Sequence, residues 1–397
     1  MSRLKMYLPE EVEFIISKLL SHGFTAEVVG GAVRDFLLGH EPNDYDVTTS
    51  ATPSEIKEVF KASKTVDTGI KHGTVTVVLK GKPYEITTYR IDGEYLDARR
   101  PESVSFTRSI QDDLSRRDFT VNAMAYSTRF GLIDLFSGKR DLKNGIIRAV
   151  GSAEKRFSED ALRILRALRF ASKLDFAIDA ETSAAIYQKA QLLSRVARER
   201  IYVEWQKLLK GPGAYRIINE YKEVIKVFLP ELDEISLPYE KEFSACDSDL
   251  RFISLFCEKG SDAWCKALDG LRADNKTKLF GKALLENLEV KLDSAYEMKH
   301  MLSKIGEEYT KKLVDFRRLI KLGSKGEEQL LNGIIESGEC YRLSDLKISG
   351  NDLVKMGVRG KQTGEILSSA LDAVMSGKVK NEREELLFFV GKLRPRA

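Results

Sequence analysis

The sequence predicts an α+β domain at the N-terminus, followed by helical domains over the rest of the chain. Residues 1–130 mix strand-like and helix-like segments without the regular alternation of a doubly wound sheet. From about residue 145 onward the strand signals fade, and helical periodicity continues to residue 397. A chain of 397 residues exceeds the usual size of one domain, so we expect several domains with sizeable cores.

The composition is that of an ordinary soluble protein, with 43% hydrophobic and 31% charged residues. The four cysteines lack zinc-site spacing, and no stretch approaches the ~18 apolar residues of a membrane span. We therefore expect a cytoplasmic protein with reduced thiols and no membrane partner. The formal charge is only +4, but residues 140–173 hold nine Lys and Arg against four Asp and Glu. Such an excess either steers a nucleic-acid backbone or forms a solvated helix face.

The first functional candidate is the step from strand to helix at Gly30 and Gly31. Residues 26–29 form a short β-branched run, and residues 32–38 form a short helix that Gly39 closes. The two glycines leave backbone N–H groups open to a phosphate at the helix start, and Arg34 adds a forked cation in the first turns. The plain alternative is a Gly-Gly turn with no ligand.

Two acidic residues follow directly, Asp44 and Asp46 around Tyr45. On a strand, residues two apart point to one face about 6–7 Å apart, and carboxylates that close repel each other unless a hard cation lies between them. Mg²⁺ is the natural candidate, and a solvated strand end is the alternative. Because a triphosphate cradle and a metal site lie within 17 residues of sequence, residues 30–46, the combination predicts nucleotidyl transfer.

The rest of the N-terminal domain has clear local signals. Residues 52–55, Thr-Pro-Ser-Glu, form a capping box at a helix start. Strand-like runs follow at residues 64–68, 73–80 and 84–89, and Gly81 with Lys82 joins the last two as a hairpin.

Two features of this region remain open between a functional and a structural role. Glu85, on the second hairpin strand, is either a third acidic group near Asp44 and Asp46 or an exposed strand carboxylate. Residues 90–106 have no period and alternate in charge, so we expect a long loop of the kind that is often functional.

A polar tract at residues 112–118 leads into an apolar run at residues 119–125, which we expect to be helical. Arg116 and Arg117 lie beside the expected start of that helix, where they would either grip phosphates or pair with Asp112 and Asp113.

Residues 159–169 predict a basic amphipathic helix with Ser158 as its N-cap. Asp160 and Arg163 are three residues apart, so a carboxylate and a guanidinium can present adjacent acceptor and donor edges. Cytosine and adenine both offer an exocyclic amine beside a ring-nitrogen acceptor, whereas guanine and uracil offer a carbonyl and a ring N–H. Asp160 and Arg163 therefore either bind cytosine and adenine or form an ordinary surface ion pair.

These motifs, in this order, resemble those of the class II tRNA nucleotidyltransferases, the CCA-adding enzymes of bacteria and eukaryotes. The matching residues are Gly30-Gly31-x-x-Arg34-Asp35 with Asp44-x-Asp46, Arg116-Arg117-Asp118, Asp141 to Gly145 with Arg148, Glu159-Asp160-x-x-Arg163, Arg198 to Ile201 with Glu204, and Ile348 to Leu353. The resemblance covers nearly the whole chain and is weakest across residues 215–330.

The resemblance implies a polymerase-β-like nucleotidyltransferase head with a mixed sheet, followed by all-helical neck, body and tail domains. The implied bounds are 1–145 for the catalytic head, 146–210 for the base-reading neck, 211–330 for the body and 331–397 for the tail, the last two binding tRNA. It implies template-independent addition of CMP, CMP and AMP to the 3′ end of tRNA from CTP and ATP, with two Mg²⁺ ions.

The resemblance also implies roles for individual residues. Asp44 and Asp46 would be the catalytic metal ligands, and the nucleotide-binding residues would be Gly31, Arg34, Arg117, Asp118, Glu159, Asp160, Arg163, Arg166 and Arg169. Relatives that add only A, or a poly(A) tail, share these motifs and remain alternatives, as does a non-catalytic RNA-binding module. The loop at residues 90–106 disfavours a CC-adding relative, and a monomer and a homodimer both remain open.

Overall fold

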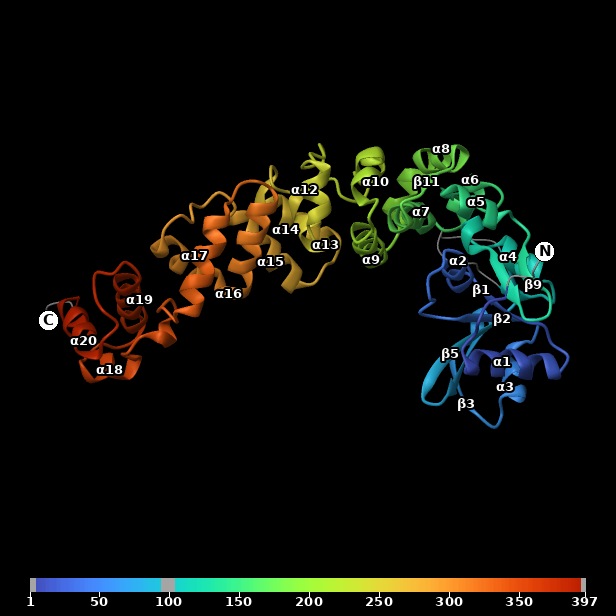
Figure 1. Ribbon diagram of the computed structural model, residues 1–397, viewed down its shortest axis with the longest axis horizontal. Coiled ribbons are helices and arrows are strands. Elements are labelled where there is room, and N and C mark those ends of the chain that lie inside the picture. The colour runs from blue at the N-terminus through green and yellow to red at the C-terminus, as the bar shows by residue number, and fades with distance from the viewer. Residues whose placement is uncertain (1–4, 94–103, 394–397) are drawn as a thin grey trace. The chain divides into compact units, whose positions relative to one another are not determined.

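The computed structural model describes residues 5–93 and 104–393, which fall into two compact units (Figure 1). The first unit runs to Asp233 and includes Gly270–Arg272, and the second holds Glu234–Asp269 and the chain from Ala273 onward. The division into head, neck, body and tail stays a prediction.

The N-terminal part of the first unit is built on a seven-stranded mixed sheet in the order β3-β4-β5-β2-β1-β8-β9. Only β2 and β5 pair in parallel, and the other neighbours are antiparallel, which confirms the predicted α+β class. The strands are β1 (Ala26–Val29), β2 (Asp46–Thr49), β3 (Lys64–Gly69), β4 (Thr74–Leu79), β5 (Lys82–Thr88), β8 (Met124–Ser127) and β9 (Gly131–Asp134).

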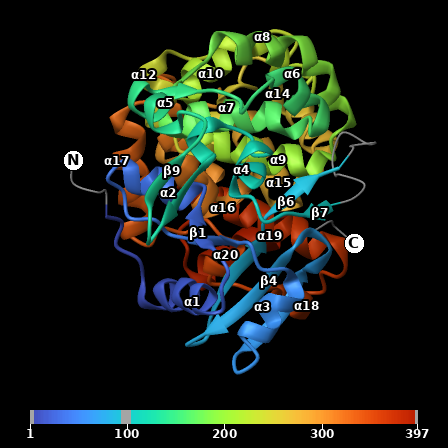
Figure 2. The ribbon, with the colours of Figure 1, turned by 90° about the vertical axis from the view of Figure 1, so that its right-hand side faces the viewer.

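Short helices flank this sheet, and α1 and α3 pack against it at β1, β2 and β4 (Figure 2). Helix α1 buries Val12, Ile15, Ile16 and Leu19, whose spacing of three and four residues forms one apolar face. Thr52 caps α3 in the predicted capping box. The helices are α1 (Glu10–Ser21), α2 (Gly31–Leu37), α3 (Pro53–Val59) and α4 (Ile110–Ser115), with a short 3-10 turn η1 (Ile70–His72).

The predicted β4–β5 hairpin is present, but its turn is formed by Lys80 and Gly81, both with positive φ, and Lys82 already belongs to β5. The expected loop at residues 90–106 begins and ends as paired strands, β6 (Arg90–Asp92) and β7 (Val104–Phe106), so the prediction is wrong at both ends. Its residues 94–103 lie outside the described residues.

The helix expected at residues 119–125 is wrong. The segment forms a 3-10 turn, η2 (Thr120–Asn122), and then enters β8. All four residues of β8 are buried between β1 and β9, so the strand lacks the polar alternation that marks a half-exposed one. A short continuous apolar run of this kind does not distinguish a strand from a buried helix.

The remainder of the first unit is helical around α7, which packs against α9 and α10. One two-residue parallel pair, β10 (Ile146–Ile147) with β11 (Ala177–Ile178), corrects the expectation that this part is all-helical. The helices are α5 (Gly138–Asn144), α6 (Ala153–Glu159), α7 (Leu162–Leu174), α8 (Ala180–Lys189), η3 (Ala190–Arg195), α9 (Arg198–Leu209), α10 (Ala214–Glu220) and α11 (Lys222–Ile225).

The regular elements in the described part of the second unit are all helices, and Trp264 is buried in its core. Its ring lies edge-on to Phe252 and Phe256, and a Cβ on Gly281 would meet it at 2.3 Å, so α15 approaches closely only because that residue is glycine. No helix among the described residues has the length and apolarity to cross a membrane. The helices are α12 (Glu240–Ala245), α13 (Ser248–Ser254), α14 (Gly260–Gly270), α15 (Asn275–Glu286), α16 (Ala295–Leu319), α17 (Lys325–Glu336), η4 (Leu343–Asp345), α18 (Gly350–Lys355), α19 (Lys361–Met375) and α20 (Arg383–Lys392).

Candidate active site

Gly30 and Gly31 lie where β1 ends and α2 begins, as the sequence predicts. Gly30 has φ +69°, and a Cβ there would come within 3.2 Å of Arg117 Nη1. A Cβ on Gly31 would lie 3.6 Å from Arg34 Nη2. The two glycines therefore form a shallow cradle with a guanidinium at each side, Arg117 beside Gly30 and Arg34 beside Gly31.

Asp46 is the first residue of β2 and pairs in register with Val29, immediately before Gly30. Asp44 precedes the strand, so only one of the two carboxylates that we expect on a strand lies on it. Partial desolvation and the charge of Asp44 raise the pKa of Asp46 above its ordinary value. The nearby Arg117 opposes them without reversing the shift. Both aspartates are exposed, and neither carboxyl group accepts a hydrogen bond from the described chain.

Glu85 lies on β5, the parallel neighbour of β2. Val47 is paired with Ile86, and extending this register by one residue places Glu85 beside Asp46. The described residues nevertheless contain no group of three or more His, Cys, Asp or Glu side chains arranged to hold a metal ion.

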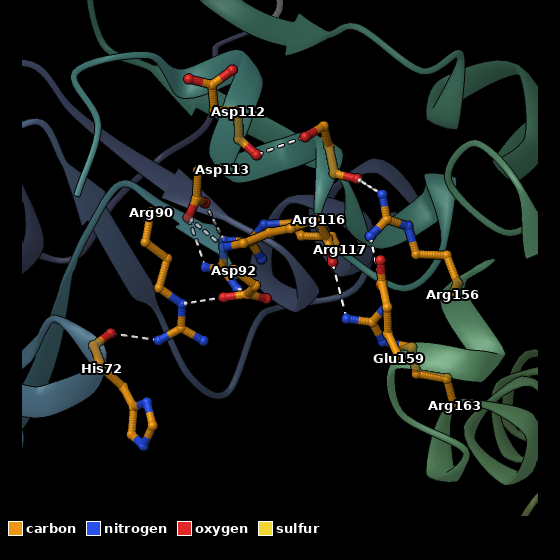
Figure 3. Close-up of polar contacts among 11 residues, drawn as sticks. His72, Arg90, Asp92, Asp112, Asp113, Arg116, Arg117, Arg156, Glu159 and Arg163 are labelled. Carbon is orange, nitrogen blue, oxygen red and sulfur yellow. Dashed lines mark hydrogen bonds and ion pairs between the residues drawn. The ribbon is translucent and has the colours of Figure 1, made fainter. Parts of the chain in front are cut away.

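Arg116 and Arg117 both bind Asp113, the fully buried carboxylate of α4 (Figure 3). Arg116 Nη2 lies 2.6 Å from Asp113 Oδ1, and Arg117 Nη2 lies 3.1 Å from Oδ2. Burial raises the pKa of Asp113, but the two arginines more than reverse this and leave it below its ordinary value. The expected partner Asp112 instead accepts a hydrogen bond from the Thr107 hydroxyl. Asp113 therefore fixes two guanidinium groups but cannot neutralise both, and Arg116 also lies 3.9 Å from Asp92.

A buried acid that the sequence analysis missed is Glu27 on β1, which is 5% exposed. Its carboxyl group accepts a hydrogen bond from the Tyr89 hydroxyl, which also bonds to Thr25. Burial raises the pKa of Glu27 to about 7, the Tyr89 hydrogen bond opposes this, and the negative charge of Asp113 adds to it. The signal in the sequence is a glutamate within an otherwise apolar strand.

Asp118 lies beside helix α7 and binds Arg166 there. Arg166 Nε lies 2.9 Å and Nη2 2.5 Å from Asp118 Oδ2, while Oδ1 accepts from the Phe119 N–H and from Asn122. Burial alone would raise the pKa of Asp118, but Arg166 and these donors lower it to about 2. At 9% exposure, Asp118 is placed to orient Arg166, which is itself one-third exposed.

The helix predicted at residues 159–169 is broken at Asp160. Helix α6 ends at Glu159, Asp160 is extended with φ −137° and ψ 103°, and α7 begins at Leu162. Ser158 is not an N-cap, since it lies inside α6, whose cap is Ser152. The Asp160 side chain accepts the Leu162 N–H, a local hydrogen bond that competes with a continuous helix.

The side chains of Asp160 and Arg163 do not bind each other in this structure, and the residues meet only through the Arg163 N–H, which donates to the Asp160 carbonyl at 2.9 Å. Arg200 of α9 donates to Asp160 Oδ2 at 3.1 Å. Arg163 Nη1 donates to Glu159 at 2.8 Å and its Nη2 to the Arg116 carbonyl at 3.1 Å (Figure 3). Each group is therefore held by its own partner.

The remaining predicted arginines surround Phe170 of α7. The Cζ atoms of Arg169, Arg34 and Arg166 lie 3.7, 5.3 and 5.4 Å from the ring centroid. Arg34 is 4% exposed and donates to Asp35 and Asn122, and Arg169 pairs with Glu204 of α9. Helix α9 thus supports α7 through one residue at each end of the contact, Arg200 at Asp160 and Glu204 at Arg169.

Three family models match successive parts of the chain. The Poly A polymerase head domain matches residues 26–148, the RNA and SrmB-binding site of polymerase A matches residues 175–236, and tRNA nucleotidyltransferase domain 2 matches residues 253–390.

Full-length relatives and solved structures agree with these matches. The CCA-adding enzyme of Ligilactobacillus salivarius is 38% identical over 392 residues, 96% of this chain and 95% of the relative. The crystal structure of the Bacillus stearothermophilus CCA-adding enzyme in complex with CTP matches with a TM-score of 0.80 at 33% identity, covering 98% of both chains. A complex of a CCA-adding enzyme with ATP matches with a TM-score of 0.70 at 25% identity, covering 98% of this chain and 96% of that one.

Proposed function

The chain belongs to the family of CCA-adding enzymes, the tRNA nucleotidyltransferases, and from this premise we propose how its own residues carry out the reaction. It adds CMP, CMP and AMP to the 3′ end of tRNA from CTP and ATP, releasing pyrophosphate at each step. The observation that carries the assignment of residues is the meeting of Asp46, Arg117 and the Gly30–Gly31 step at one end of β1 and β2.

Asp44 and Asp46 are proposed to hold two Mg²⁺ ions. The donor set fits, since both are exposed carboxylates without a protein partner in the described chain, and the charge of Asp44 disfavours the ionisation of Asp46. When bound, such ions favour ionisation of the tRNA 3′-hydroxyl and balance the charge on the departing pyrophosphate. The protein needs no covalent intermediate, because it supplies position and fixed charge.

The triphosphate is proposed to lie over Gly30 and Gly31 between Arg117 and Arg34. The glycines let it approach the backbone, and Asp113 fixes Arg117 in place without fully neutralising it. Arg166, oriented by Asp118, and Arg169, held by Glu204, would face the nucleotide from α7. In this assignment Asp118 and Glu159 act through the arginines that they bind.

Base selection is assigned to Asp160 and Arg163. The carboxylate would accept from the exocyclic amine of cytosine or adenine, and the guanidinium would donate to the adjacent ring nitrogen. Guanine and uracil would leave like groups facing each other unpaired. Because Glu159 and Arg200 hold the two readers separately, Arg163 must shift part of its hydrogen bonding from Glu159 to the base.

The domain roles follow the same assignment. Residues 1–145 form the catalytic head, 146–210 the base-reading neck, and 211–330 and 331–397 the tRNA-binding body and tail. Duplex RNA offers side chains little sequence to read, so body and tail would contact mainly shape and backbone. We place the enzyme in the cytoplasm and propose that it acts as a monomer or homodimer.

Replacement of the metal ligands tests this assignment. Asp46→Asn should lower CMP and AMP incorporation by at least about 10³-fold, because the ions contribute several kcal/mol of charge stabilisation and 1.36 kcal/mol equals tenfold. It should also weaken Mn²⁺ binding in the presence of CTP. The matched control is Asp67→Asn, an exposed head carboxylate that is 51% exposed and pairs with Lys57. Normal incorporation by Asp46→Asn, or equal loss in both variants, would overturn the assignment.

A further inference from the structure

Charge pairing around the candidate site is complete at most positions. Arg34 pairs with Asp35, Arg166 with Asp118 and Arg169 with Glu204, so each of these cations meets one carboxylate. A nucleoside triphosphate carries up to four negative charges, and paired cations offer it donors but little net charge. The unpaired positive charge around the cradle is therefore the quantity that decides phosphate affinity.

Lys173 supplies such a charge. It lies in the last turn of α7, is exposed, and has no hydrogen bond or ion pair within the described chain. It follows Arg169 by four residues, one helical turn. Desolvation lowers the pKa of Lys173, and so do the positive charges of Arg34 and Arg169, while Asp35 opposes them. Lys173 also follows Phe170 by three residues on α7, and the Arg34 Cζ lies 5.3 Å from the Phe170 ring centroid. This turn of the helix therefore adjoins the side of the cradle that Arg34 occupies.

The cradle has a direction. At one end Asp46 and Arg117 adjoin Gly30, where the reacting phosphate must lie if the aspartates hold the metal ions. Gly31 and Arg34 come next, and the turn of α7 that carries Lys173 adjoins Arg34 through Phe170. A triphosphate bound with its α-phosphate at Asp46 would extend past Gly31 and Arg34 toward this turn of α7.

We propose that Lys173 binds the terminal phosphates of the incoming CTP or ATP and the pyrophosphate that leaves. This inference rests on the proposed assignment of Asp44, Asp46, Arg117 and Arg34. It adds a binding residue that acts on both nucleotides alike, since it contacts the part that they share.

Direct nucleotide binding tests the proposal separately from catalysis. For Lys173→Gln we expect CTP and ATP to bind about tenfold more weakly, the scale of one charge-assisted hydrogen bond, while CMP affinity stays unchanged. Lys173→Arg should restore most of the loss, and the loss should shrink at high salt. The control is Lys143→Gln, an exposed lysine in the last turn of α5 without an ion pair in the described chain.

Kinetics give the second readout. In Lys173→Gln the KM for CTP and for ATP should rise together with kcat little changed, and inhibition by added pyrophosphate should weaken about tenfold. Equal weakening of CMP binding and CTP binding would overturn the proposal. A rise confined to the KM for tRNA would also overturn it, because Lys173 would then bind the RNA backbone. If wild-type protein transferred no nucleotide while the CTP-against-CMP difference persisted, the proposed function would fail and the phosphate site would stand.

Discussion

Replacing the buried acid on β1 by its neutral isostere, Glu27→Gln, should make the first unit more stable at alkaline pH. Glu27 is 5% exposed, accepts a hydrogen bond from Tyr89 and faces the negative charge of Asp113. The glutamine side chain keeps the shape and an acceptor for the Tyr89 hydroxyl, and it removes the titration.

The magnitude follows from the difference in proton binding. The pKa of Glu27 rises from 4.5 to about 7 in the folded protein, so between these values the folded chain holds a proton that the unfolded chain releases. The contribution of Glu27 to stability is therefore highest below pH 4.5 and is lost as the pH rises through 7. At 1.36 kcal/mol for each unit of pKa difference, the total is at most about 3 kcal/mol.

Amide hydrogen exchange at β1 and β8 is the suitable assay, because it reports on the unit that contains Glu27 even if the two units unfold separately. From about pH 5 to about pH 8, the exchange free energy of Glu27→Gln relative to wild type should increase by about 2–3 kcal/mol. Asp67→Asn, at an exposed position of the same sheet, should show no such trend. A pH-independent difference between Glu27→Gln and wild type would refute the reasoning.

Two ion-pair changes and one glycine test the site itself. Asp118→Asn should cost about 2 kcal/mol of stability and raise the KM for both nucleotides, because Arg166 loses its counter-charge but is one-third exposed; denaturation and initial rates check this. Arg200→Met should free Asp160 and reduce discrimination against GTP and UTP about tenfold, measured by misincorporation. Gly30→Ala should cost about 1–3 kcal/mol of stability and abolish CTP binding, because a Cβ is strained at a φ of +69° and would lie 3.2 Å from the Arg117 guanidinium. Normal CTP affinity, measured by calorimetry, would contradict this prediction.

Features encoded within a few residues were predictable from the sequence. The Thr52 capping box, the hairpin into β5 and the Gly30 step between strand and helix are each specified by the chemistry of adjacent residues, although the hairpin turn lies one residue earlier than predicted. Their success reflects the short range of the interactions that form them.

The errors lie where distant residues decide local structure. The run at residues 119–125 is apolar enough for a helix, but β1 and β9 take residues 124–127 as a strand. At Asp160 the helical pattern continues in sequence while a local hydrogen bond and Arg200, 40 residues away, hold an extended residue. Tertiary context overrides periodicity in both cases.

The candidate residues were found by residue type and order, but their partners were not. Asp118 is predicted to bind the nucleotide, whereas in the structure it is nearly buried and orients Arg166, 48 residues away. Glu27 and Tyr89 are 62 residues apart, and nothing in either segment identifies the other. Pairing across such separations depends on the assembled sheet and helices.

The most direct test of the whole account is product sequencing on three tRNA transcripts, ending before CCA, after C and after CC, each with CTP and ATP. The account predicts that all three finish as CCA, with Asp160 and Arg163 reading both bases at one site. Extension of only the transcript that ends in CC would make this chain an A-adding enzyme, and a run of A residues would make it a poly(A) polymerase. Either result would contradict the assignment of one dual base reader.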